Sequence, residues 1–128
     1  KIKMIIRGIC CLIPIHHKNI QVISIIDRFL EHTRIFIFNN NKKNETYISS
    51  ADWMTRNLDN RVEVTCPIHD SKIKKEINDI FNIYWSDNVK SRLINQKDAN
   101  VYKSDIKKSN LLRSQLEIYN YYKSKIEN

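Results

Sequence analysis

The residues from His32 to Glu63 include the side chains of this sequence that are best suited to phosphoryl chemistry. They are one histidine, three arginines, one serine and two carboxylates, namely His32, Arg34, Ser50, Asp52, Arg56, Arg61 and Glu63. A guanidinium group matches phosphate oxygens, and an imidazole can attack phosphorus or carry a proton. The set therefore indicates a site for a phosphoryl group, in which the carboxylates would orient the histidine or the arginines.

Strand periodicity gives these side chains a common side. His32 and Arg34 are two positions apart at the expected start of a strand, so their side chains should leave the same face. Arg61 and Glu63 have the same spacing on a later expected strand, which would turn the valines at 62 and 64 toward a core. The alternative is a surface network of ion pairs, with Arg61 paired to Glu63 or Asp59. Composition alone does not choose between the two interpretations.

The sequence patterns around this set predict strands and helices that together form an α/β fold with a mixed sheet flanked by helices. Expected strands cover residues 1–7, 34–38, 46–50 and 61–66, and a second short apolar run occupies residues 9–13. Ser24 and Asp27 resemble a capping box for a short helix over residues 24–31. Apolar residues at helical spacing predict a helix after Asp70 or Ser71 and another over residues 112–126, with a shorter one over 88–95. Residues 96–109 are polar and should lack regular structure.

Length and composition set limits on the function. The 128 residues suffice for one domain, and no apolar run approaches the roughly 18 residues of a membrane span. The net charge of +8 favours a polyanionic partner, although the heavy use of lysine, asparagine and isoleucine accounts for that charge equally well. The three cysteines have no metal-binding spacing, and we expect ordinary buried thiols in a reducing compartment. Trp53, Trp85 and the tyrosines at 119, 121 and 122 are expected in the core.

Spacing gives the set a likeness to a known pattern. His-x-Arg, then Ser-x-Asp, an arginine six positions after the serine and a glutamate seven further on resemble the half-site of the phospholipase D superfamily. The usual form there has lysine where this chain has Arg34, and asparagine where it has Asp52. Both differences would favour a strongly bound phosphate over a lipid or nucleic-acid diester.

A closer likeness covers essentially the entire chain. Residues 6–12, 29–32, 47–59 and 61–64, with Leu112, Arg113, Gln115 and Leu116 near the end, resemble the long-chain polyphosphate kinase family. The string Ser-Ser-Ala-Asp-Trp-Met-Thr-Arg-Asn, at 49–57, is highly specific to that family. The resemblance implies that residues 1–128 are a fragment, the second phospholipase D-like catalytic domain without its opening strands.

The resemblance also implies an activity and roles for individual residues. The family reversibly transfers the terminal phosphate of ATP to inorganic polyphosphate through a phosphohistidine, which lies in an upstream domain. His32 matches the partner histidine of the second domain and would also lie at the ATP site, and Arg7 matches an arginine that contacts the nucleotide phosphates. Arg34 and Arg56 would bind phosphate, supported by Ser50, Asp52, Arg61 and Glu63.

Further expectations follow from the same resemblance. Mg²⁺ is required, with its ligands in the upstream part, so no metal ligand is assigned here. The partners would be ATP or ADP, polyphosphate, the upstream domains and further copies of the chain in a homo-oligomer, with no nucleic acid and no transmembrane segment. The setting would be cytoplasmic, with membrane association left open. The fragment alone should be inactive, and a shortened loop at residues 14–20 departs from the family pattern.

Two other functions remain open at this point. The first is a phospholipase D-type phosphodiesterase or nuclease that pairs two half-sites in a homodimer. The second is a basic module that binds polyanions without catalysis, in which lysines carry the binding and His32 has no role.

Overall fold

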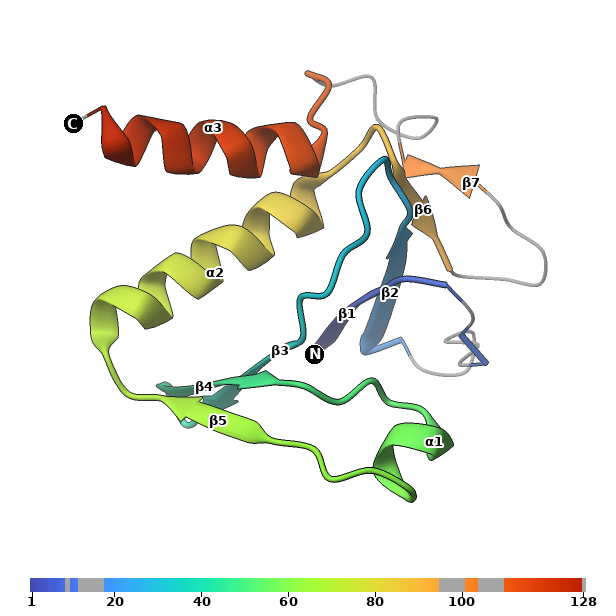
Figure 1. Cartoon of the computed structure of the whole chain (residues 1–128). Coiled ribbons are helices and arrows are strands. Elements are labelled where there is room, and N and C mark those ends of the chain that lie inside the picture. Colours follow the sequence, from blue (N-terminus) through green and yellow to red (C-terminus); the bar gives the residue numbers. More distant parts are fainter. Residues whose placement is uncertain (9, 12–17, 95–100, 104–109, 128) are drawn as a thin grey trace. The chain divides into compact units, whose positions relative to one another are not determined.

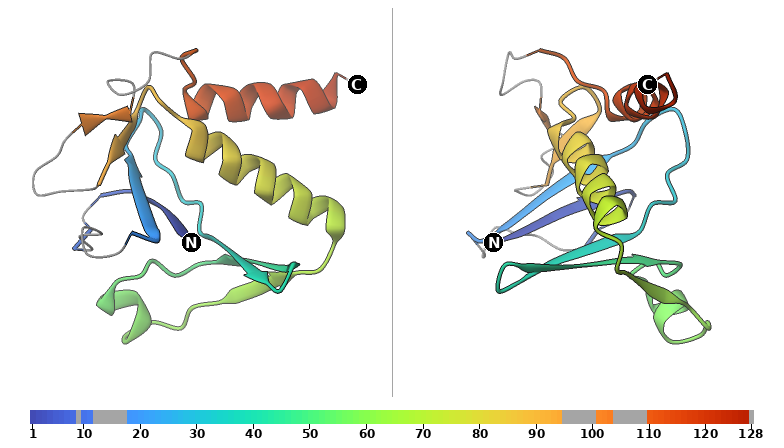
Figure 2. Two further views of the ribbon diagram at one scale, coloured as in Figure 1. Left: turned by 180° about the vertical axis from the view of Figure 1, so that it is seen from behind. Right: turned by 90° about the vertical axis from the view of Figure 1, so that its left-hand side faces the viewer.

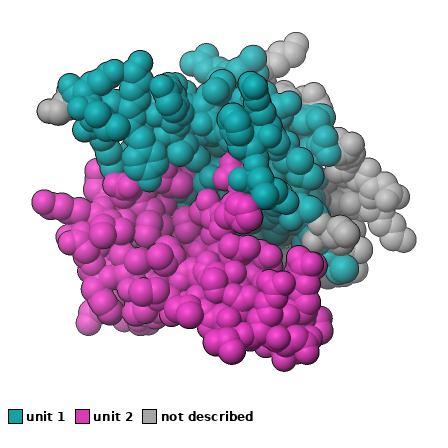
Figure 3. Space-filling model, viewed as in Figure 1, with its two compact units in different colours: residues 1–30, 81–128 teal, residues 31–80 magenta. Residues whose placement is uncertain are grey.

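The computed structural model describes residues 1–8, 10–11, 18–94, 101–103 and 110–127 (Figure 1). The chain forms two compact units, which are coloured separately in Figure 3. Unit 1 comprises residues 1–30 and 81–128, and unit 2 comprises residues 31–80. Each unit has its own sheet, so one expected sheet is in fact two.

Unit 1 contains a four-stranded mixed sheet, seen from two further sides in Figure 2. Its strands lie in the order β1 (Ile2–Ile6), β2 (Ile20–Ile25), β6 (Ser91–Leu93) and β7 (Val101–Tyr102). β1 and β2 are parallel, whereas β2 with β6 and β6 with β7 are antiparallel. Val22, Ile23 and Ile25 of β2 are at most 4% exposed. Their burial, worth about 1.5–3 kcal/mol for each side chain, forms the core of this unit.

Helix α3 (Ser114–Ile126) belongs to unit 1 and begins at an anchored residue. The buried carboxylate of Asp87 accepts the Ser114 N–H through Oδ2 at 2.8 Å. Its Oδ1 accepts the N–H groups of Val89, Lys90 and Ser91 at 2.7–3.1 Å. One carboxylate therefore both turns the chain after helix α2 and fixes the first residue of α3.

Unit 2 contains a three-stranded antiparallel sheet with the order β3 (Ile35–Asn40), β4 (Lys43–Ser49) and β5 (Thr65–Ile68). Asn41 and Lys42 join β3 to β4 with positive φ angles of 48° and 69°. Two central residues with positive φ match the right-handed twist of a hairpin. Helix α1 (Thr55–Leu58) lies between β4 and β5.

Helix α2 (Ser71–Ser86) begins where the sequence predicts. Asp70 Oδ1 accepts the N–H groups of Lys72 at 2.8 Å and Ile73 at 2.9 Å. This is the expected N-cap, because a side-chain oxygen satisfies amides that have no partner inside the helix. The α/β class, the mixed sheet and the C-terminal helices are confirmed. No helix within the described ranges is long and apolar enough to cross a membrane.

Two expected helices are wrong. Residues 20–25 form β2, where Ser24 pairs with Ile6 and Arg92, and residues 26–34 contain no helix. The β-branched run before Ser24 favours a strand, which overrides the capping-box pattern. The expected helix over 88–95 is instead a turn followed by β6 (95 lies outside the described residues), because Asp87 binds three successive amides.

The expected strand at 61–66 starts only at Thr65, and Val62 and Val64 are 98% and 65% exposed instead of facing a core. In the expected run 9–13, Cys10 and Cys11 are not in a strand, and 9, 12 and 13 lie outside the described residues. In the segment 96–109, which was expected to lack regular structure, residues 101–102 form β7. Residues 96–100 and 104–109 lie outside the described part of the chain, as do residues 14–17 of the shortened loop.

Several expected core residues are exposed. Trp53 is 73% exposed and Tyr119 65%, because their rings have no deep core to enter and Trp53 instead stacks on Phe36 at a centroid distance of 5.7 Å. The three cysteines are free thiols, but Cys11 and Cys66 are exposed, contrary to the expected burial.

Candidate functional site

Arg34 is the most firmly held cation of the candidate set. It lies directly before β3, where its backbone carbonyl accepts the Ser49 N–H at 3.0 Å. Its side chain donates from Nε to Asp52 Oδ1 at 2.7 Å and from Nη1 to the His32 carbonyl oxygen at 3.1 Å. The guanidinium is therefore held by two partners, and its third nitrogen, Nη2, binds neither of them.

The pair between Arg34 and Asp52 keeps both groups charged. The hydrogen bond from Arg34 lowers the pKa of the Asp52 carboxyl, with burial opposing part of the effect and the charges of Arg34, Arg56 and His32 adding to it. The same bond raises the pKa of Arg34. The two side chains are 24% and 41% exposed, so water screens part of their attraction while leaving the geometry in place.

A second network joins Ser50, Glu63 and Asn57. Ser50 Oγ donates a short hydrogen bond to Glu63 Oε2 and accepts the Val64 N–H at 3.0 Å. Asn57, which is 2% exposed, donates from Nδ2 to Glu63 Oε1 at 3.2 Å. Both carboxylate oxygens of Glu63 thus bind neutral donors instead of Arg61, and the acid closes the loop between β4 and β5.

Asn57 is a positioning residue that the sequence reasoning did not single out. It occupies helix α1, which sets its amide toward Glu63. Asn57 is part of the family-specific string at 49–57, but an asparagine at such a position is equally typical of an exposed turn. Only its burial distinguishes it.

His32 and two arginines are on the surface of unit 2. His32 is exposed, and among described residues its ring makes no hydrogen bond. Arg56, in the last turn of α1, and Arg61 are also exposed, and neither forms an ion pair with another described residue. These three groups are accessible to a ligand, and the predicted surface pairs of Arg61 with Glu63 or Asp59 do not form.

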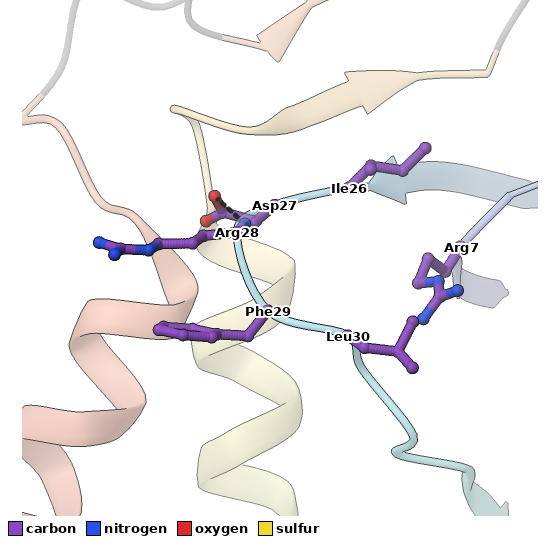
Figure 4. Close-up of a pocket in the computed structure, with 6 residues that line it drawn as sticks. All are labelled: Arg7, Ile26, Asp27, Arg28, Phe29 and Leu30. Atoms are coloured by element: carbon purple, nitrogen blue, oxygen red, sulfur yellow. Dashed lines mark hydrogen bonds between the residues drawn. The ribbon is translucent and has the colours of Figure 1, made fainter.

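Arg7 belongs to unit 1 and directly follows β1. It lines a pocket of about 250 Å³ together with residues 26–30, as Figure 4 shows. The next residue, Gly8, has a φ of 88°, which a side-chain-bearing residue rarely adopts. This turn directs the chain away from the strand while Arg7 stays at its end.

The structure brings most of the candidate residues of unit 2 together, although by a different route from the one expected. Direct bonds join His32 to Arg34 and Arg34 to Asp52, and others join Ser50 to Glu63. The expectation that strand alternation aligns them is wrong, since His32, Arg34, Arg61 and Glu63 all lie outside the strands. That Arg7 and His32 share one pocket stays a prediction.

Asp52 and Glu63, the two carboxylates of the candidate set, already have hydrogen-bond partners. Within the ranges the structure covers, no three His, Cys, Asp or Glu side chains gather as metal ligands. Glu63 uses both oxygens on Ser50 and Asn57, and Asp52 is bound to Arg34.

Comparison with known proteins identifies a close group of relatives. A family model described as polyphosphate kinase C-terminal domain 2 matches residues 1–115. The polyphosphate kinase of Vibrio parahaemolyticus is 50% identical over 97% of this chain, and that of Escherichia coli K12 is 44% identical over 96%. The chain spans 18% of the length of each of these relatives.

A solved structure agrees in fold. The crystal structure of polyphosphate kinase from Porphyromonas gingivalis matches 99% of this chain with a TM-score of 0.91 and 46% sequence identity. The matched part is 20% of that chain.

Proposed function

Because this chain belongs to the polyphosphate kinase family, we propose that it forms one part of an ATP:polyphosphate phosphotransferase. The substrates are ATP and inorganic polyphosphate, and the reaction moves the terminal phosphoryl group of ATP reversibly onto the polyphosphate end. The remaining parts of the active site come from residues upstream of this segment. The observation that carries the proposal is an Arg34 guanidinium held by both Asp52 and the His32 carbonyl, beside an exposed imidazole.

Transfer of the phosphoryl group proceeds in two steps. An upstream histidine nitrogen attacks the γ-phosphorus of ATP, the bond to the bridging oxygen breaks, and ADP leaves. A terminal oxygen of polyphosphate then attacks the phosphohistidine, which lengthens the polymer by one unit and frees the histidine. The phosphorus–nitrogen bond keeps a high transfer potential, so both steps are reversible.

The residues of this segment stabilise charge during these steps. His32, whose exposed ring is open to a ligand, donates a proton to the leaving oxygen or orients it. Arg34, fixed in advance, and the exposed Arg56 neutralise charge on the transferring phosphoryl group. The role of Arg7, in unit 1, is to contact the nucleotide phosphates. Ser50, Asp52 and Glu63 hold this arrangement, and Arg61 adds positive charge at its edge.

Mg²⁺ enters the proposal as a metal held by upstream residues and by the phosphates. It would neutralise phosphate charge, and no residue of this segment is assigned to it. The setting is cytoplasmic, the assembly is a homo-oligomer, and the isolated segment is inactive because it lacks the nucleophile.

The test uses the full-length protein and two histidine variants. His32→Ala should abolish polyphosphate synthesis from ATP, whereas His69→Ala, at an exposed histidine after β5, should leave synthesis unchanged. The wild type should form an acid-labile phosphoenzyme. Equal activity of the two variants would remove His32 from the mechanism.

Assays of the same full-length protein distinguish the proposed function from the two alternatives, a phosphodiesterase and a polyanion-binding module. Cleavage of a model phosphodiester without ATP would identify a phosphodiesterase. Polyphosphate binding that falls steeply with salt and is indifferent to His32→Ala, with no ATP turnover, would identify a binding module. Turnover of ATP by the isolated 128 residues would contradict the assignment of the nucleophile to an upstream domain.

A further inference from the structure

The segment of residues 26–30 has no regular structure, yet it lines the pocket that contains Arg7. Packing of its apolar side chains contributes little to its conformation, since Ile26 is 55%, Phe29 63% and Leu30 62% exposed. In Figure 4 the side chains of Arg28 and Phe29 extend away from Arg7. The conformation of this segment must therefore come from specific polar contacts.

The first contact is an ion pair with the residue that precedes α3. Arg113 donates from Nε to Asp27 Oδ2 at 2.8 Å and from Nη2 to Asp27 Oδ1 at 2.6 Å. The Asp27 side chain is only 1% exposed. A two-pronged bond between a guanidinium and a carboxylate fixes direction as well as distance, so it orients the start of the segment.

The second contact holds the middle of the segment by its backbone. The Phe29 N–H donates to Gln115 Oε1 at 3.1 Å, and Gln115 Nε2 donates to the Phe29 carbonyl at 2.9 Å. One side-chain amide thus satisfies both backbone groups of a single residue, as a neighbouring strand would. The two contacts, from Arg113 to Asp27 and from Gln115 to Phe29, are called the α3 clasp below.

The clasp has a rigid base. The Ser114 N–H, between its two members, binds Asp87 Oδ2 at 2.8 Å, and Ser114 is fully buried. Just before it, the Leu112 N–H binds Asn88 Oδ1 at 2.7 Å, and the Asn88 N–H binds the Leu112 carbonyl at 3.1 Å. The backbone that carries Arg113 and Gln115 is therefore fixed by these contacts, and the two side chains in turn fix the position of residues 26–30.

We propose that Arg113 and Gln115 are positioning residues that hold residues 26–30 in the shape that lets the Arg7 pocket bind the phosphates of ATP. This inference rests on the proposed function for the identity of the ligand. The clasp touches neither ATP nor the reacting phosphorus. It acts by keeping the binding-competent conformation of the pocket populated.

The consequence for binding follows from population arithmetic. Without the clasp, water can satisfy the Phe29 backbone groups in many conformations of the segment. The apparent affinity for ATP then falls in proportion to the fraction of molecules that keep the competent one. Since chemistry within that fraction is unchanged, the effect should fall on KM for ATP much more than on kcat.

The experiment measures steady-state polyphosphate synthesis by the full-length protein. Gln115→Leu removes two hydrogen bonds and should raise KM for ATP about tenfold while changing kcat little. The control is Asn120→Leu, which replaces an exposed amide on the same helix and should leave both constants unchanged. Gln115→Glu keeps an acceptor for the Phe29 N–H but loses the donor, so its KM should lie between those of the wild type and Gln115→Leu.

Hydrogen exchange at the Phe29 amide gives a readout that does not depend on catalysis. Exchange should be faster in Gln115→Leu than in Asn120→Leu, and Arg113→Lys should give a smaller acceleration. If synthesis is normal in the wild type but Gln115→Leu leaves KM for ATP unchanged, the inference is wrong. If the wild type makes no polyphosphate from ATP, the proposed function fails, and the exchange data still decide whether the clasp fixes the segment.

Discussion

Arg34 and Asp52 are eighteen positions apart in the chain, and a hydrogen bond of 2.7 Å joins Nε of the arginine to Oδ1 of the aspartate. Because Nη1 also binds the His32 carbonyl, the guanidinium is oriented before any ligand arrives. A preoriented cation stabilises developing charge without the cost of reorganising during the reaction. The pair therefore positions the cation that lies nearest to His32 in sequence.

A lysine in place of Arg34 should not reproduce this arrangement. Arg34→Lys keeps the charge but loses the bond geometry of Nε and Nη1, so kcat/KM for polyphosphate synthesis should fall by about 10- to 100-fold. Asp52→Asn should lower it less. The double variant should cost less than the sum of the two single effects, since both remove one interaction. Full additivity would mean that the two residues act separately.

Asn57 should contribute to stability through Glu63. Asn57→Ala removes a buried amide, leaves Glu63 Oε1 without its donor, and should destabilise the protein by about 1–3 kcal/mol. Asn60→Ala, at an exposed asparagine in the same loop, should have almost no effect. Urea unfolding followed by tryptophan fluorescence compares them, and equal midpoints would show that the amide of Asn57 does not support Glu63.

The ion pair between Asp27 and Arg113 should give unit 1 a dependence on acid. The hydrogen bond from Arg113 lowers the pKa of Asp27 from its ordinary value of 3.8. A lowered pKa in the folded state means that the stabilisation is complete above pH 3.8 and is lost as the pH falls through the folded value.

Asp27→Asn should abolish this part of the pH dependence. Its stability relative to the wild type should be lowest near neutral pH and should approach the wild-type value in acid. Urea midpoints measured at several pH values test this. A difference that stays constant down to the acid range would show that the carboxylate charge is not the source.

The cap of helix α2 provides a fourth prediction. Asp70→Ala removes the acceptor for the amides of Lys72 and Ile73 and should cost about 1 kcal/mol. Asp70→Ser should recover most of the loss, because serine is also a good N-cap. Thermal unfolding of the three proteins measures the order, and a serine variant as unstable as the alanine variant would argue against capping.

The sequence by itself determined the elements whose signal is local. Periodic apolar residues and the oxygen of Asp70 predicted α2, and the β-branched residues of β1 and the polar turn after β3 predicted those strands. Local patterns suffice there because periodicity and capping act within a few residues of each other. The likeness to a family also named the candidate set, from His32 to Glu63, before any contact was known.

Only the tertiary structure decided the rest. The capping-box pattern at Ser24 gave way to β2, because pairing with two neighbouring strands outweighs one local hydrogen bond. Asp27 does not cap a helix but binds Arg113, and Glu63 binds Ser50 and Asn57 instead of an arginine. These partners are six, thirteen and eighty-six positions apart along the chain, and neither the helix nor the strand repeat predicts such pairs. Which carboxylate holds which cation is set by packing, since a carboxylate binds whichever donors the fold places within about 3 Å of it.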